Sequence, residues 1–299
     1  MAIRRGYPRR VRRAVALLLA LTALAAGCGG ETESGPFTTG DEPLGVELGP
    51  QRTVEDGVVV RQVVYRSGED RVSGYLVAPA AAEKPSPAVL YLHGAGGDRE
   101  EQLDAAVRLA REGAAGLTIT APSRGKSPPA GATPEETLRW QRDTIVADVV
   151  AARRGLDLLA DDDRVDPERL GLVGWSMGGR LATIVAGVDD RVRAAVLMST
   201  GAVPVAEYVA AAPEELRDDV EAVLPQIDPL SYVDDIQGAL LVQAGRADSV
   251  VPQRALRAVL DAAPDDATVE WYATDHALDA RALDDRVAWL ADRLWLRPA

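Results

Sequence analysis

A serine flanked by glycines is the first candidate for chemistry in this chain. The segment Gly174-Trp175-Ser176-Met177-Gly178 follows an expected strand, Leu170 to Val173, and precedes a helix expected to begin at Met177. A nucleophile at such a tight strand-to-helix turn needs neighbours without bulk, and both flanking positions are glycine. The first N–H groups of the helix would favour negative charge that develops beside the serine. The pattern therefore predicts that Ser176 is a catalytic nucleophile.

A serine hydroxyl needs a base to take its proton, and a histidine can do this near neutral pH. The chain has only two histidines, His93 and His276. Where a strand, a serine and a helix meet in this way, the usual order along the chain is Ser, then Asp or Glu, then His, which selects His276. We interpret His93, at the end of an earlier expected strand, as a hydrogen-bonded residue that supports its own loop.

The acid that orients the base is expected in a loop after a strand that lies between the serine and the histidine. Asp248 follows the expected strand Ala239 to Gln243 directly, and we predict it as the third member. Asp275 is the rival, but as the immediate neighbour of His276 its carboxylate would diverge from the ring. The structural alternative for Asp248 is a helix cap or turn residue ahead of Pro252.

Acyl transfer also needs hydrogen-bond donors for the oxyanion. The expected donors are the backbone N–H of Met177 and that of Ala95, which lies among glycines in the segment His93 to Gly97. The paired and tripled aspartates of the chain lack the spacing of a calcium loop and are interpreted as solvated turns. We therefore expect no metal and no cofactor.

The elements that must position these residues alternate along the chain. Strands are expected at 88–92, 116–120, 170–173, 194–198, 239–243 and 268–272, with helices between most of them and after the last. Two or three short strands precede them, between Val58 and Val77. This alternation predicts a mostly parallel sheet that is covered on both faces. An irregular, partly helical insert at about 201–235 is expected to form a small cap over the substrate pocket.

From about Val72 to its end, the chain resembles the dienelactone-hydrolase and prolyl-oligopeptidase-like branch of the α/β-hydrolase superfamily. The resemblance is carried by the segments Leu92 to Gly97, Val165 to Gly171, Gly174 to Gly179, Asp248 to Pro252 and Asp275 to Ala277. It implies the α/β-hydrolase fold, with a mostly parallel sheet of about eight strands and helices on both faces. Dienelactone hydrolases proper use a cysteine nucleophile, so Ser176 indicates esterase or peptidase relatives.

We expect a serine hydrolase that cleaves a carboxylic ester or a related acyl compound through an acyl-enzyme intermediate. An exopeptidase or amidase remains open, because the same triad cleaves amides and the resemblance includes peptidases. A non-catalytic binding protein on a hydrolase scaffold also remains open, although the combination of Ser176, Asp248 and His276 counts against it. The sequence indicates no oligomeric state.

The amino end has a different character. Six arginines precede an uncharged apolar run, Ala14 to Ala26, and Cys28 is the only cysteine. This order indicates a signal peptide over residues 1–27. Leu24 to Cys28 resembles a bacterial lipobox, with Ala25 where that motif usually has Leu, and an ordinary cleavage site is the alternative. We expect a lipid on Cys28, a flexible lipid-anchored tether over 28–50, a hydrolase domain over 51–299, and a position on the extracytoplasmic face of the cell membrane.

The charge balance limits the partners. With 33 basic and 46 acidic residues, the formal net charge is −13, which argues against nucleic acid. Membrane association would come from the lipid on Cys28 and not from a basic patch. The single cysteine excludes an intramolecular disulfide.

Overall fold

The computed structural model describes residues 35–54, 57–80 and 85–294. Cys28 and the expected signal peptide over 1–27 lie outside the described residues. Within these three ranges, no helix combines the length and apolar character that crossing a membrane requires.

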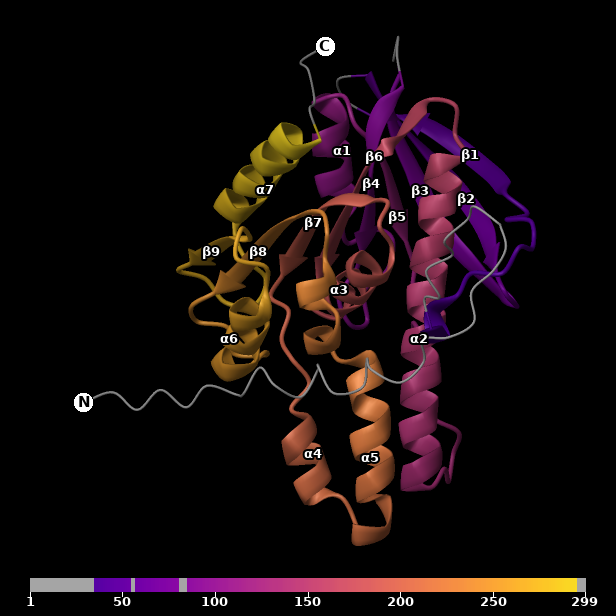
Figure 1. Ribbon diagram of the computed structural model, residues 1–299. Helices are drawn as coiled ribbons and strands as arrows, with labels where there is room; N and C mark the ends of the chain where they lie inside the picture. Colours follow the sequence, from indigo (N-terminus) through magenta and orange to yellow (C-terminus); the bar gives the residue numbers. More distant parts are fainter. Residues whose placement is uncertain (1–34, 55–56, 81–84, 295–299) are drawn as a thin grey trace, which may run out of the picture. The chain divides into compact units, whose positions relative to one another are not determined.

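One sheet of nine strands runs through the described chain, in the order β1-β2-β3-β5-β4-β6-β7-β8-β9 (Figure 1). The strands are β1 (Glu47–Thr53), β2 (Val58–Ser67), β3 (Asp70–Pro79), β4 (Ser86–Leu92), β5 (Ala115–Ile119), β6 (Val165–Trp175), β7 (Val192–Met198), β8 (Ala239–Gly245) and β9 (Thr268–Tyr272). The first three strands pair antiparallel, as does β3 with β5, and every pair from β5 to β9 is parallel. The predicted α/β-hydrolase fold is confirmed, with nine strands where about eight were expected.

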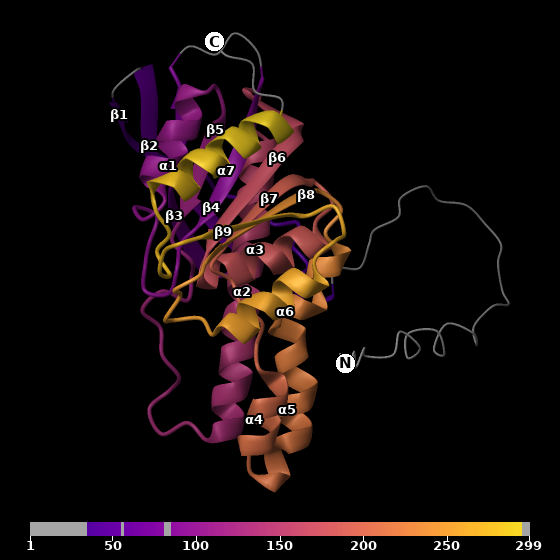
Figure 2. The same cartoon turned by 90° about the vertical axis from the view of Figure 1, so that its left-hand side faces the viewer.

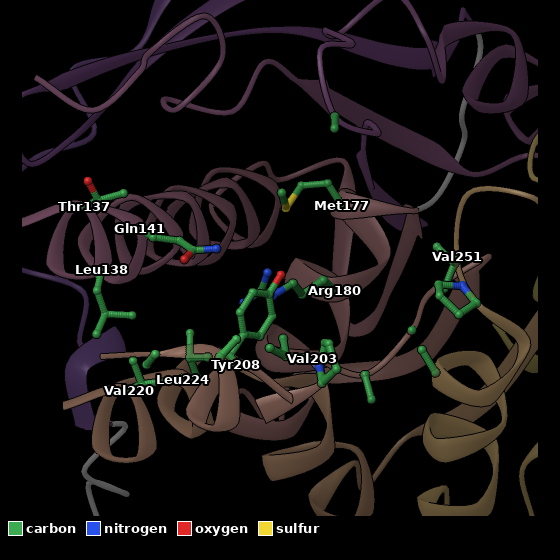
Figure 3. A pocket seen from close by; sticks show the side chains of 18 of the residues that line it. Thr137, Leu138, Gln141, Met177, Arg180, Val203, Tyr208, Val220, Leu224 and Val251 are labelled. Atoms are coloured by element: carbon green, nitrogen blue, oxygen red, sulfur yellow. The ribbon is translucent and has the colours of Figure 1, made fainter. Parts of the chain in front are cut away.

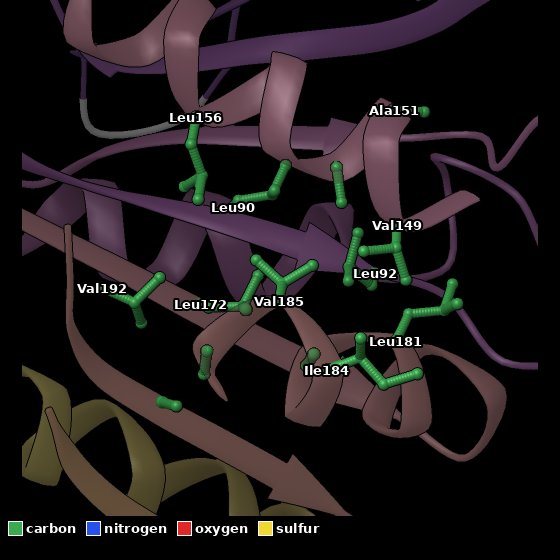
Figure 4. Packing of buried hydrophobic residues seen from close by; sticks show 14 of the residues in the cluster. Leu90, Leu92, Val149, Ala151, Leu156, Leu172, Leu181, Ile184, Val185 and Val192 are labelled. Atoms are coloured by element: carbon green, nitrogen blue, oxygen red, sulfur yellow. The ribbon is translucent and has the colours of Figure 1, made fainter. Parts of the chain in front are cut away.

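Helices cover both faces of this sheet (Figures 1 and 2). The helices are α1 (Leu103–Arg111), α2 (Pro134–Ala160), α3 (Met177–Val188), α4 (Val205–Ala211), α5 (Arg217–Val223), α6 (Gln253–Ala262) and α7 (Ala280–Arg293). Side chains of β4 alternate between the two layers, as the pleat of a strand requires. Leu90 packs in the cluster with α2 and α3 (Figure 4), whereas Val89 and Tyr91 pack in the cluster with α1 and α7.

The long helix α2 begins at a well-defined cap. The Thr133 hydroxyl accepts a hydrogen bond from the Glu136 N–H, and the Glu136 carboxylate accepts one from the Thr133 N–H. Pro134 occupies the first helical position, where its missing N–H costs nothing. This reciprocal cap fixes where α2 begins, and the first turns of the helix carry residues that line the cavity described below.

Part of the segment expected to be a flexible tether is ordered on the domain. The side chain of Phe37 is 1% exposed, and its carbonyl accepts a hydrogen bond from the Arg153 guanidinium on α2. Strand β1 also begins at Glu47, within the expected tether of residues 28–50. The structure therefore differs from that expectation for residues 35–50. The physical reason is that one buried aromatic ring and one edge strand anchor a segment whose composition is otherwise polar.

Residues 201–235, where the sequence predicted a cap, hold α4, α5 and four short 3-10 helices. These are η3 (Glu214–Leu216), η4 (Leu224–Ile227), η5 (Pro229–Ser231) and η6 (Val233–Asp235). Helices α4 and α5 extend beyond the sheet in both views (Figures 1 and 2). Helix α5 lies beside the first turns of α2, and α4 packs against α5.

Candidate active site

The turn between β6 and α3 holds Ser176 in a backbone conformation that side chains rarely adopt, with φ of 55° and ψ of −113°. The flanking glycines make this turn sterically possible. A Cβ on Gly174 would lie 2.1 Å from the carbonyl oxygen of Gly178, and a Cβ on Gly178 would lie 2.3 Å from that of Leu92. Both contacts are with backbone, which cannot rotate away as a flexible side chain could. The glycine spacing read from the sequence therefore has the steric cause that was expected of it.

The structure brings Ser176, His276 and Asp248 together at the carboxyl ends of parallel strands of the sheet. Ser176 follows β6, Asp248 lies in the loop after β8, and His276 lies in the loop after β9. The Ser176 Oγ lies 2.9 Å from the His276 Nε2, and the His276 Nδ1 lies 2.9 Å from the Asp248 Oδ2. The Asp248 side chain is fully buried and that of His276 is 12% exposed. In this arrangement, Nδ1–H donates to the carboxylate and leaves Nε2 free to accept the serine proton.

Both oxygens of Asp248 are occupied. Oδ2 faces the imidazole, while Oδ1 accepts the backbone N–H groups of Val250 and Val251 at 2.9 and 2.8 Å. These two bonds fix the orientation of the carboxylate. The turn-residue alternative considered for Asp248 is thus a second role of the same side chain, because the carboxylate both holds its turn and contacts His276.

Within the described residues, Asp275, the rival candidate, makes no hydrogen bond with the imidazole ring. Its Oδ1 accepts hydrogen bonds from the N–H of Ser249 at 2.9 Å and from the N–H of His276 at 2.7 Å. Those N–H groups lower the pKa of the Asp275 carboxyl below its ordinary value. The carboxylate therefore ties the loop that carries Asp248 to the loop that carries His276.

Two further side chains hold the backbone of the base. The Trp175 Nε1 and the Ser199 Oγ both donate to the carbonyl of His276, at 3.0 and 2.9 Å. The Trp175 indole also packs against the imidazole, with ring centroids 5.3 Å apart. The sequence left Trp175 unassigned and missed Ser199, since no pattern along the chain marks a contact between residues that are 101 and 77 positions apart.

The loop that carries Ala95 is held by hydrogen bonds at its base. The buried His93 donates from Nδ1 to the Gly94 carbonyl at 2.7 Å and accepts the Ala121 N–H on Nε2 at 2.9 Å. The Gly94 N–H donates to the Glu101 carboxylate at 2.6 Å. Both nitrogens of His93 are thus occupied by its own loop and the segment beside it. Ala95 and Met177, the two predicted oxyanion donors, line the same cavity as Ser176.

A cavity of about 710 Å³ opens beside Ser176 (Figure 3). Its walls come from the start of α2, from α3, and from the insert with α4 and α5. Most of the lining is aliphatic, and includes Leu138, Val203, Leu216, Val220 and Leu224. Such a cavity can bind an acyl chain by removing its apolar surface from water. Among the described residues, no three His, Cys, Asp or Glu side chains gather as a metal site would require.

Comparison with known proteins points to hydrolases. A model of the dienelactone hydrolase family matches residues 72–298. NocK of Nocardia uniformis subsp. tsuyamanensis, which is named as an esterase, is 30% identical over 244 residues, 78% of this chain and 68% of its own. YtaP of Bacillus subtilis strain 168, named as a hydrolase, is 27% identical over 172 residues, 52% of this chain and 56% of its own.

The solved structures that resemble this one share its fold. The acetyl xylan esterase from Paenibacillus sp. R4 superposes with a TM-score of 0.72 at 19% identity, covering 84% of this chain and 90% of that one. Acetyl xylan esterase 1 from Thermoanaerobacterium sp. JW/SL YS485 gives 0.69 at 17% identity, with coverages of 85% and 89%. At these identities, the agreement concerns the architecture of the chain.

Proposed function

Because this chain belongs to the dienelactone hydrolase family, we propose that it is a serine hydrolase that cleaves carboxylic esters through an acyl-enzyme intermediate. The observation that carries the proposal is the pair of 2.9 Å contacts that link Ser176 to His276 and His276 to Asp248. The esterase name of the relative NocK and the apolar cavity beside the serine support an acyl ester as substrate.

In the proposed reaction, the Ser176 Oγ attacks the ester carbonyl carbon while His276 Nε2 takes the hydroxyl proton. Asp248 stabilises the imidazolium that forms, and the N–H groups of Met177 and Ala95 receive the oxyanion. The C–O bond to the alcohol then breaks, and His276 returns its proton to the departing oxygen. A water molecule, activated by the same histidine, cleaves the acyl-enzyme and releases the acid.

The experiment that tests this proposal combines covalent labelling with ester turnover. Purified protein is treated with a fluorophosphonate probe, the adduct is located by mass spectrometry, and hydrolysis of ethyl valerate is followed. We expect a label on Ser176 and turnover, both lost in Ser176→Ala. Ser86→Ala is the matched control, because Ser86 begins β4, at the end of that strand opposite the site, and it should retain both. Labelling of another serine, or full turnover by Ser176→Ala, would refute the nucleophile. Folded protein with neither label nor turnover would favour the non-catalytic binding protein.

We also propose that the chain is exported and carries a lipid on Cys28, which would hold it at the extracytoplasmic face of the membrane. The support is the order of charged, apolar and small residues before Cys28. Cys28→Ser should release the protein from detergent-free membrane fractions of the producing cell. If the variant stays in those fractions, the anchor is not this lipid.

A further inference from the structure

Arg180 brings a guanidinium into the apolar cavity one helical turn after the nucleophile. Its backbone N–H donates to the Ser176 carbonyl at 3.0 Å, so the two residues share the first turn of α3. Its side chain makes one hydrogen bond within the described residues, from Nε to the Ile227 carbonyl at 2.8 Å. The Nη2 atom is buried and has no hydrogen-bond partner there.

A buried guanidinium with unsatisfied donors raises the free energy of the folded protein unless another group pairs with it. Burial lowers the pKa of Arg180, and the charge of Asp228 only partly offsets this. No ion pair joins the two within the described residues, and Asp228 Oδ1 accepts the N–H groups of Val203 and Leu230. Neither terminal nitrogen of Arg180 is paired within the described residues, so a ligand that enters the cavity can pair with Nη1, and a rotation of the side chain would expose the buried Nη2 to it.

The charge of the cavity wall suits an anion. Of the residues that line it, only Arg180 and Arg254 are charged, and none is acidic. Arg254 is paired with Glu207, and both side chains are largely exposed. Arg180 is therefore the cation that faces the interior. The formal charge of −13 of the whole chain acts at longer range, where salt screens it beyond about 8 Å.

Resting on the proposed esterase function, we propose that Arg180 selects esters whose acyl group ends in a carboxylate, such as monoesters of short dicarboxylic acids. Hydrolysis of such an ester consumes one water and releases the alcohol and a dicarboxylate. A guanidinium presents donors in a fork that matches a carboxylate, and such charge-assisted pairs are stronger than neutral hydrogen bonds.

The carboxylate belongs to the acyl side of the ester. His276 must give its proton to the departing oxygen, so the alcohol lies on the side of the imidazole. The cavity with Arg180 is lined by Ser176 and by both oxyanion donors, but His276 is not among its lining residues. The group that remains bonded to Ser176 is the one that extends toward Arg180.

Two neutral polar side chains lie where they can donate further hydrogen bonds to a carboxylate bound by Arg180. Gln141 from α2 and Tyr208 from α4 point into the same part of the cavity as Arg180 (Figure 3). An amide N–H and a phenolic O–H can both donate to a carboxylate that Arg180 holds, and neither adds negative charge.

The test compares two esters of the same chain length, monoethyl glutarate and ethyl valerate, by the ratio of their kcat/KM values. The wild type should prefer monoethyl glutarate. Arg180→Met should lower the ratio about 10- to 100-fold, the range expected when a charge-assisted contact is lost, and Arg180→Lys should lower it less. Arg254→Met removes the other arginine of the cavity and is expected to keep the wild-type ratio.

A wild type that prefers ethyl valerate would overturn the proposal, as would an equal loss of the ratio in Arg180→Met and Arg254→Met. If Arg180→Met does not fold, competitive inhibition of the wild type decides, since glutarate should inhibit ethyl valerate hydrolysis more strongly than the neutral glutaramide. If neither ester is hydrolysed and Ser176 is not labelled, the esterase function itself has failed. Calorimetric binding of glutarate to the wild type then supports the Arg180 site, and its absence overturns it.

Discussion

Replacing Asp248 with asparagine changes one atom of the site and reverses a hydrogen bond. Because Oδ1 of Asp248 accepts the N–H groups of Val250 and Val251, the oxygen of an asparagine must take this position to keep both bonds. Its NH₂ group then stands where Oδ2 stood, 2.9 Å from the His276 Nδ1. It donates to that nitrogen, so the ring proton moves to Nε2 and faces Ser176, where it blocks proton transfer.

The size of the fall in kcat depends on the free energy needed to turn the asparagine amide around and so restore the active tautomer of His276. Turning the amide around restores the ring but leaves two backbone N–H groups facing an NH₂ group, at about 1–3 kcal/mol for each unsatisfied donor. In serine proteases, the equivalent substitution lowers kcat about 10⁴-fold while the geometry is kept. For Asp248→Asn we expect kcat on ethyl valerate to fall about 10³- to 10⁴-fold, with a melting temperature close to that of the wild type.

Asp275→Asn is the matched control, because the same substitution is made beside the same histidine. Asp275 holds the N–H groups of Ser249 and His276, and it makes no hydrogen bond with the ring in the described part of the chain. We expect it to lose about tenfold in kcat or less, the equivalent of one neutral hydrogen bond. Steady-state kinetics, with active sites counted by fluorophosphonate titration, measure both variants. If Asp248→Asn loses less than Asp275→Asn, the assignment of the acid is refuted.

Two further predictions concern the framework of the site. Gly178→Ala would place a Cβ 2.3 Å from the Leu92 carbonyl oxygen. We therefore expect fluorophosphonate labelling of Ser176 to be lost and thermal unfolding to show a stability lower by about 1–3 kcal/mol. Normal labelling would contradict the steric explanation of the turn between β6 and α3. Burial raises the pKa of Asp189, but bonds and charges from Arg191 and Arg153 outweigh it and hold the pKa below its ordinary 3.8. Asp189→Asn should therefore cost about 2–3 kcal/mol in urea unfolding at pH 7, less than a fully buried pair because Arg191 is partly exposed. The difference should persist down to about pH 4 and disappear as the pH falls through the lowered pKa, and equal stability at pH 7 would contradict it.

The arrangement of the catalytic candidates could be predicted because each follows a strand that the sequence shows clearly. Apolar runs marked β6 and β8, and the β-branched and aromatic residues of Thr268–Tyr272 marked β9. Ser176, Asp248 and His276 follow these strands in the order that such turns use. Parallel strands end at one edge of a sheet, so residues that follow them lie close together whatever their separation along the chain. This is why local patterns were enough to choose Asp248 over Asp275.

The residues that were missed depend on contacts between distant segments. Ser199 and Trp175 reach the His276 carbonyl only after four strands, from β6 to β9, have paired. Phe37 is the only phenylalanine of the chain and lies in a polar stretch, so its burial against the domain left no periodic signal. Arg180 stands in a helix whose other positions are mostly apolar, and only the structure shows that its guanidinium forms no ion pair with a carboxylate of the described residues. The composition of a segment indicates its general character, but only the folded structure shows which of its side chains are buried or hydrogen-bonded.

The position of Arg180 also determines where the carboxylate of the proposed substrate lies relative to its ester carbonyl. Ser176 and Arg180 are joined by a backbone hydrogen bond and lie one turn apart, about 6 Å along the axis of α3. The distance from the attacked carbonyl to the cation is therefore fixed by the same helix that positions the nucleophile. Tyr208 and Leu224 come instead from the insert at 201–235, which packs against α3 and also holds the Arg180 guanidinium through the Ile227 carbonyl. Recognition of charge thus depends on both the catalytic turn and the insert, and the insert also sets the width and depth of the cavity.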